Sequence, residues 1–126
     1  MKRVSFVVRP EDVPTYVPAG AHKGTVNRRL VSGQNLEMIL GEIAAGGVAE
    51  PHYHDPEEQV LYLLEGKCLI EIEGKSQEMH PGQAAYFAPR QLHKVVPIGG
   101  PIKVIVVYAP PLPEGAGAFK LPTHSN

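Results

Sequence analysis

The sequence has little of what would define several large classes of protein. Tryptophan is absent and cysteine occurs once, at Cys68, so no disulfide can form within the chain. No apolar run approaches the length of a membrane span. Twelve basic against thirteen acidic side chains leave a net charge of −1, without the basic excess of nucleic-acid-binding proteins. We therefore expect a cytoplasmic protein that has neither a nucleic acid nor a membrane as its partner.

Long segments without glycine or proline are also missing. Thirteen glycines and thirteen prolines are spread along 126 residues, and no stretch without either is longer than nine residues. Globular helices average about eleven residues, so an all-β fold is favoured. Between the Gly and Pro turns, apolar and alternating runs predict strands at Val4–Val8, Thr25–Val31, Leu36–Ala44, Glu58–Glu65, Lys67–Glu73, Lys75–Met79, Ala84–Ala88, His93–Val96 and Ile102–Ala109.

Many short strands at this spacing are typical of one sandwich or closed barrel. We expect a single domain over 1–126, with an N-terminal strand and arm in 1–24, a barrel in 25–109 and an extended tail in 110–126. We also expect a homodimer, because an isolated sheet of short strands exposes strand edges that need cover. The apolar N-terminal strand, held away from the barrel by a proline-rich arm, is suited to pairing with a second copy.

Two histidines stand out as candidate metal ligands. His52 and His54 are two residues apart, so on an extended chain they point to the same face. The pair alone would also suit a polar strand end. A carboxylate or amide at the start of the next strand, and a third histidine past a later turn, favour a metal site; these residues are Glu58, Gln59 and His93.

The run Gly46-x5-His52-x-His54 through Gly66, followed by Gly82 through Pro89 to His93, resembles the two motifs of the cupin superfamily. This resemblance implies a double-stranded β-helix, or jelly-roll barrel, with one divalent transition metal ion inside it. Iron, manganese, nickel, copper and zinc all occur in the family. Carried over, the metal ligands are His52, His54, His93 and either Gln59 or Glu58.

The sequence departs from the family pattern in two places. The second motif lacks the usual glycine, and Pro89 stands one place nearer to His93 than usual. The first motif is one residue longer between His54 and Gly66, which leaves two positions for the fourth ligand. Counting forward from His54 leads to Glu58, and counting back from Gly66 leads to Gln59.

Strand register favours Gln59 over Glu58. Gln59 shares a strand face with Leu61 and Leu63, which belong in the barrel interior in the family pattern. A loop absorbs an inserted residue, whereas a paired strand does so only through a bulge. The insertion is therefore expected in Asp55–Glu57, with Glu58 facing outward. A neutral amide would leave the metal ion its full charge and favour an anionic oxygen on the substrate.

Several functions are compatible with such a site. The first is a metal-dependent enzyme acting on a small molecule: a dioxygenase of an aromatic or dicarbonyl substrate, or alternatively an isomerase, lyase or cyclase. The second is a non-catalytic module that binds a metal or small molecule, and the third is a storage-type cupin, against which the three histidines count. Dioxygenation is preferred because alternation predicts an apolar lining with few carboxylates, made of Met38, Leu40, Leu61, Leu63, Ile70, Ile72 and Tyr86.

Two other histidines lie outside the strands that form the predicted barrel. His22 falls in the N-terminal arm and His124 in the tail, and solvated surface positions are expected for both.

Overall fold

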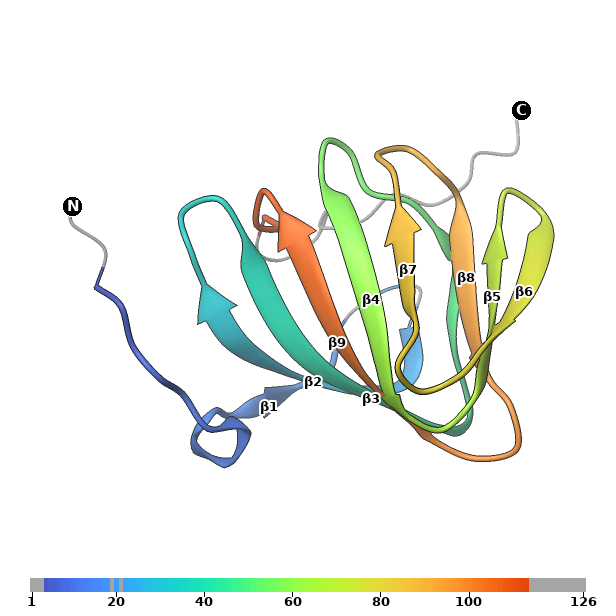
Figure 1. Cartoon of the computed structure of the whole chain (residues 1–126), viewed down its shortest axis with the longest axis horizontal. Coiled ribbons are helices and arrows are strands. Elements are labelled where there is room, and N and C mark those ends of the chain that lie inside the picture. The colour runs from blue at the N-terminus through green and yellow to red at the C-terminus, as the bar shows by residue number, and fades with distance from the viewer. Residues whose placement is uncertain (1–3, 19, 21, 114–126) are drawn as a thin grey trace.

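The computed structural model describes residues 4–18, 20 and 22–113, and its regular structure is almost entirely antiparallel β (Figure 1). A short 3-10 helix, η1 (Pro10–Asp12), comes first. The strands are β1 (Thr15–Tyr16), β2 (His22–Ser32), β3 (Glu37–His52), β4 (Glu58–Glu65), β5 (Cys68–Ile72), β6 (Lys75–Met79), β7 (Ala84–Phe87), β8 (His93–Pro97) and β9 (Ile102–Ala109). Within the described ranges no α-helix forms, which confirms the all-β expectation, and no helix could span a membrane.

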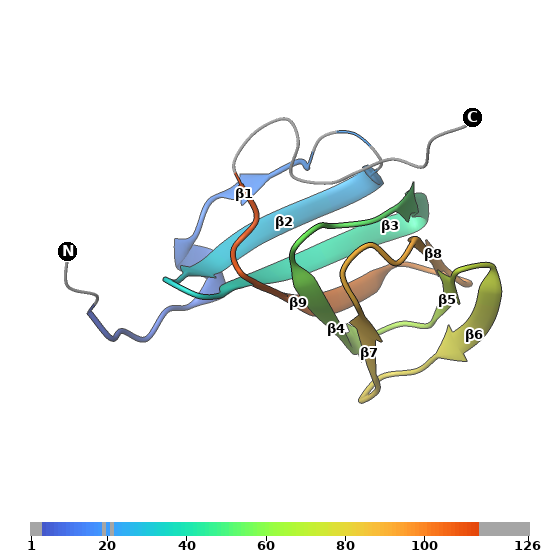
Figure 2. The ribbon, with the colours of Figure 1, turned by 90° about the horizontal axis from the view of Figure 1, so that it is seen from above.

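Strand β3 organises the sheet because it pairs with three other strands. It pairs with β2 along most of its length, from Glu37 to Ala49. On its other side it pairs first with β9 and, at its end, with β8. The strands follow the order β6-β5-β8-β3-β9-β4-β7, with β2 beside β3 and β1 beside β2. Figures 1 and 2 show this sheet curled around an interior. The arrangement is the predicted jelly roll.

Two glycines let β3 continue past the point where the sequence predicted its end. Gly46 has a φ of +82°, and a Cβ on Gly47 would lie 2.6 Å from the carbonyl oxygen of Lys23. These glycines therefore allow a close approach to β2, whose register shifts between Lys23 and Thr25. The predicted strand 36–44 is too short for this reason, and β3 carries the chain to His52.

The core fills the concave side of the sheet. Along β4 the burial alternates, with Gln59, Leu61 and Leu63 buried and Val60 and Tyr62 exposed, so the predicted register of this strand is confirmed. The buried apolar side chains are Ile39, Ile43, Ala49, Leu61, Leu63, Cys68, Ile70, Met79, Phe87, Val95, Ile102, Val104, Val106 and Tyr108.

The predicted lining is wrong on β3 and β7. Ile39 is buried in the interior, whereas Met38 and Leu40 are half-buried on the opposite face. Both faces of this part of β3 carry large apolar residues, so alternation alone does not decide between them. Tyr86 is 53% exposed and also lies outside the core.

The N-terminal arm is tied to the barrel by two arginines of β2. Arg28 donates hydrogen bonds to the carbonyl oxygens of Pro10 (3.0 Å) and Val13 (2.7 Å), which anchors η1. Arg29 pairs with the buried carboxylate of Glu37 at 2.7 Å, and its guanidinium lies 4.9 Å from the centre of the Tyr16 ring. These contacts attach β1 and η1 to the sheet.

At the N-terminal end of the described chain the predicted strand does not form, whereas the C-terminal end packs against the core. Residues 4–9 form no strand, contrary to the prediction for Val4–Val8, and the side chains of Val4, Phe6 and Val7 are exposed. None of the described strands pairs with this segment. At the other end, Leu112 packs against the core and its N–H donates to Glu37. The remainder of the predicted tail lies outside the described residues.

Removing Arg29 should destabilise the fold, because Glu37 is only 2% exposed and would keep an uncompensated charge. We expect Arg29→Ala to lower the free energy of unfolding by about 2–3 kcal/mol, less than for a fully buried pair since the guanidinium retains some water contact. Urea denaturation measures this difference. Arg9→Ala is the matched control: it breaks the exposed Arg9–Asp12 pair and should cost less than about 1 kcal/mol. Equal losses for the two variants would contradict the prediction.

Candidate metal centre

Three histidines converge at one end of the barrel. His52, at the end of β3, is the register partner of His93, the first residue of β8. His54 follows two residues after His52, and one ligand atom from each of the three rings lies within 4.8 Å of the others. All three side chains are buried. The structure thus brings together the three histidines that the sequence pattern singled out.

Backbone carbonyls orient two of these rings. The Nδ1 atom of His52 lies 2.7 Å from the carbonyl oxygen of Glu50, and that of His93 lies 3.1 Å from the carbonyl oxygen of Gln91. A carbonyl only accepts, so each Nδ1 carries the proton and each Nε2 keeps its lone pair. The Nε2 of His93 is buried and has no hydrogen-bond partner among the described residues. This arrangement is typical of imidazoles that bind a metal through Nε2.

Burial keeps these imidazoles neutral. Desolvation, with a smaller contribution from neighbouring His52, lowers the pKa of His93 to about 3. Desolvation also lowers the pKa of His52, against the opposing effect of its hydrogen bond to Glu50. A metal ion would therefore displace no proton from these two rings at neutral pH, which favours binding.

The two candidates for the fourth ligand lie on opposite sides of the sheet. Gln59 is 5% exposed and lines an internal cavity of about 50 Å³ together with His52 and His93. Its Oε1 is buried and receives no hydrogen bond from the rest of the described chain. Glu58 points outward instead, and its Oε1 accepts a 2.6 Å hydrogen bond from the hydroxyl of Tyr86. The geometry places Gln59, and not Glu58, beside the histidines.

A fourth histidine lies at the same cavity. His22 was expected on the surface, but its ring centre is 5.1 Å from that of His52 and it lines the same space. The cause is strand pairing: His22 is the partner of inward-facing Ala49 at the start of β2. Nothing in the local sequence around His22 signals this pairing. His124 lies outside the described residues.

Sequence reasoning also missed two buried polar residues, Glu37 and Tyr108, in the row of the barrel interior that contains Gln59. Glu37, Tyr108, Gln59 and Phe87 are register partners across β3, β9, β4 and β7, and all four are buried. The Tyr108 ring meets the His54 ring edge-on at 5.0 Å, and the Phe87 ring stacks on His93 at 4.1 Å. Burial, and then the Glu37 carboxylate, raise the pKa of Tyr108, so its phenol stays protonated.

The position of Gln59 leads to a direct test. We expect Gln59→Ala to lower the metal content of the purified protein, because it removes a buried oxygen at the cavity that His52 and His93 line. Glu58→Ala is the matched control and should leave the metal content unchanged, because its carboxylate is bonded to Tyr86 outside the barrel. Elemental analysis of both variants after loading with zinc or manganese makes the comparison. Retention of metal in Gln59→Ala and its loss in Glu58→Ala would reverse the assignment.

Comparison with known proteins agrees with this architecture. A family model described as the cupin domain matches residues 39–108. The pectin degradation protein KdgF of Dickeya dadantii is 26% identical over 86 residues, which cover 68% of this chain and 78% of that protein. The tetracenomycin polyketide synthase protein TcmJ of Streptomyces glaucescens is 29% identical over 105 residues, covering 76% of this chain and 70% of that protein.

Among solved structures, the polyketide cyclase RemF of Streptomyces resistomycificus has a TM-score of 0.79 and 24% identity, covering 97% of this chain and 88% of that one. At this identity the likeness concerns the fold. The matched family segment is longer than half of the chain and contains His52, His54, Gln59 and His93. The chain belongs to the cupin family.

Proposed function

We propose that this cupin is a metal-dependent enzyme acting on a small molecule, with one divalent transition metal held by His52, His54, His93 and Gln59. The observation that carries the proposal is the convergence of three buried imidazoles, two of which, His52 and His93, line a cavity together with Gln59. The amide oxygen of Gln59 is buried and has no hydrogen-bond partner among the described residues. A purely structural role would not explain this, since buried polar atoms are normally hydrogen-bonded. Nitrogen and oxygen donors of this kind suit iron, manganese, nickel, copper or zinc.

The charge of the site favours an anionic group on the substrate. Three neutral imidazoles and an amide contribute no negative charge, so a divalent ion there would act as a strong Lewis acid toward a carboxylate, enolate or phenolate oxygen. The protein itself supplies a protonated phenol in the same cavity, Tyr108, which can donate a hydrogen bond to a second substrate oxygen. Phe87, stacked on His93, excludes water from one side of the ring.

The reaction we favour is proton transfer next to a carbonyl group, as in an isomerase, lyase or cyclase. The preference for a dioxygenase depended on an apolar lining that included Met38, Leu40 and Tyr86, and none of these lies in the interior. The interior instead contains the buried Tyr108 and Glu37 at one row of the sheet. Relatives named for pectin degradation and for a polyketide synthase support chemistry on oxygen-rich carbon compounds.

Dioxygenation of an aromatic or dicarbonyl compound is the second candidate. The aliphatic layer next to the histidines favours it, because Leu61 and Val106 line the same cavity and suit an apolar substrate.

Solvent exchange separates the two reactions. Zinc-, iron- and manganese-loaded protein is incubated with β-diketones, keto acids and unsaturated sugar acids in deuterated water. We expect deuterium to enter the carbon next to the carbonyl without oxygen uptake, and His93→Ala to abolish it. Tyr108→Phe should slow the exchange by about 10- to 100-fold if the phenol assists proton transfer. Oxygen uptake in proportion to product would establish the dioxygenase, and a saturable complex without either reaction would establish a binding module.

We propose further that two copies associate through the N-terminal segment. Val4 and Val7 are 78% and 98% exposed. Exposed apolar residues that lie close together in one segment mark an association surface. Light scattering should give twice the 13.7 kDa of one chain. The double variant Phe6→Asp/Val7→Asp should be monomeric, with Val17→Asp, an exposed residue outside the segment, as control. A 13.7 kDa species for the unmodified protein at micromolar concentration would contradict the proposal.

The single cysteine and the net charge support proposals about the cellular location and about other partners. The thiol of Cys68 is buried, and burial raises its pKa to about 11, so it is unreactive and suits a reducing compartment. We therefore propose the cytoplasm. The near-neutral charge supports neither nucleic acid nor an anionic membrane as a partner.

A further inference from the structure

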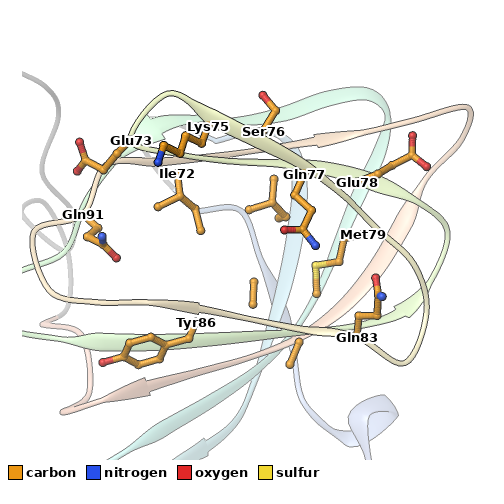
Figure 3. Close-up of a pocket in the computed structure, with 13 residues that line it drawn as sticks. Ile72, Glu73, Lys75, Ser76, Gln77, Glu78, Met79, Gln83, Tyr86 and Gln91 are labelled. Carbon is orange, nitrogen blue, oxygen red and sulfur yellow. The ribbon is translucent and has the colours of Figure 1, made fainter.

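A large cleft is lined by none of the residues of the histidine cluster. It lies between β6 and β7, the two strands at the ends of the sheet order, and has a volume of about 740 Å³. Figure 3 shows side chains of both strands facing this cleft. None of the four proposed metal ligands lines it. Small-molecule sites typically occupy about 300–1000 Å³, so the cleft has the size of a ligand site.

The floor of the cleft is apolar. Ile70 and Met79 are buried core residues on β5 and β6, and Ala85 lies opposite them on β7. Strand pairing explains why they meet: Ile70 and Ala85 point to the concave side of the sheet, and β6 and β7 do not pair with each other among the described strands. A floor of this kind takes the hydrophobic face of a ring.

The rim offers neutral hydrogen-bond donors. The side-chain oxygen of Gln83 accepts from the N–H of His80 at 2.8 Å, and that of Gln91 accepts from the N–H of Ala88 at 3.3 Å. With these oxygens engaged, each side chain presents its NH₂ group. A third amide, Gln77, lies on the opposite wall (Figure 3). Such groups match hydroxyl or carbonyl oxygens on a ligand.

The charges of the rim disfavour an anion. Two carboxylates, Glu73 and Glu78, and one ammonium group, Lys75, line the cleft. Glu73 accepts a hydrogen bond from the N–H of Leu92 at 2.9 Å, which holds its negative charge in place. A carboxylated ligand would therefore meet net repulsion.

We propose that the cleft between β6 and β7 is a second ligand site, which takes a neutral, hydroxylated ring compound. The apolar floor accepts the ring face, and the amide groups of Gln77, Gln83 and Gln91 bind its oxygens. The site does not need the metal, but it borders the metal centre. Gln91 lines the cleft while its backbone carbonyl holds Nδ1 of His93, and Ile72, also in the wall, is the register partner of His93.

The test uses the full chain and the neutral polyphenol catechin as probe, with the carboxylated phenol gallate as its anionic counterpart. Titration of isotope-labelled protein should give saturable NMR shifts at the side-chain amides of Gln83 and Gln91, with weaker binding of gallate. Ala85→Trp, which fills the cleft from the inward face of β7, should weaken catechin binding at least about tenfold. The matched control Ala45→Trp, at an exposed position outside the cleft, should bind normally.

A second variant keeps the test valid if the tryptophan variant fails to fold. Gln77 is exposed on β6, so Gln77→Leu should preserve the fold and weaken binding about three- to tenfold, whereas Gln34→Leu should not change it. Protein stripped of metal with a chelator should bind catechin like the metal-loaded protein, which separates this proposal from the metal-dependent function. Absence of saturable shifts, unchanged affinity in Ala85→Trp, or equal affinity for gallate would overturn the proposal.

Discussion

The pairing of β3 with β8 at His52 and His93 is the contact on which the candidate site depends. Antiparallel register places these two side chains opposite each other, and the sheet curls so that both point inward. His54 then reaches the same place because it is two residues further along an extended segment. Shifting the register of β8 by one residue would turn His93 to the outer face of the sheet, away from His52 and His54.

The length of β3 makes this pairing possible. One strand pairs with β9 through its first half and with β8 through its end, so it belongs to both sides of the barrel. Gly46 and Gly47 lie between these two parts and permit the register shift against β2. The same coiling of β2 around β3 brings His22 from the N-terminal arm to the histidine cavity.

Polar and apolar side chains are separated along the barrel interior. The row that contains Gln59 and Tyr108 lies beside the histidines, and the next row on the same strands consists of Ile39, Val106 and Leu61. Burial lowers the pKa of His52 and His93 and raises that of Tyr108, so these two imidazoles stay neutral and the phenol stays protonated. The open side between β6 and β7 has different chemistry, with neutral amides over an apolar floor, so one small sheet presents two unlike cavities.

The sequence by itself determined the all-β class, most strand positions, the three converging histidines and the inward face of β4. These features depend on local alternation, on turn residues and on a two-part motif, all of which act over short distances along the chain. It did not determine which face of β3 is buried, because Met38 and Leu40 are as apolar as Ile39 and the choice rests on packing against β9. Nor did it reveal His22, Tyr108 or the cleft of Figure 3, since each results from pairing between distant strands and from the edges that the closed topology leaves apart. Only the tertiary structure decides such features, because side chains far apart in sequence become neighbours through strand register alone.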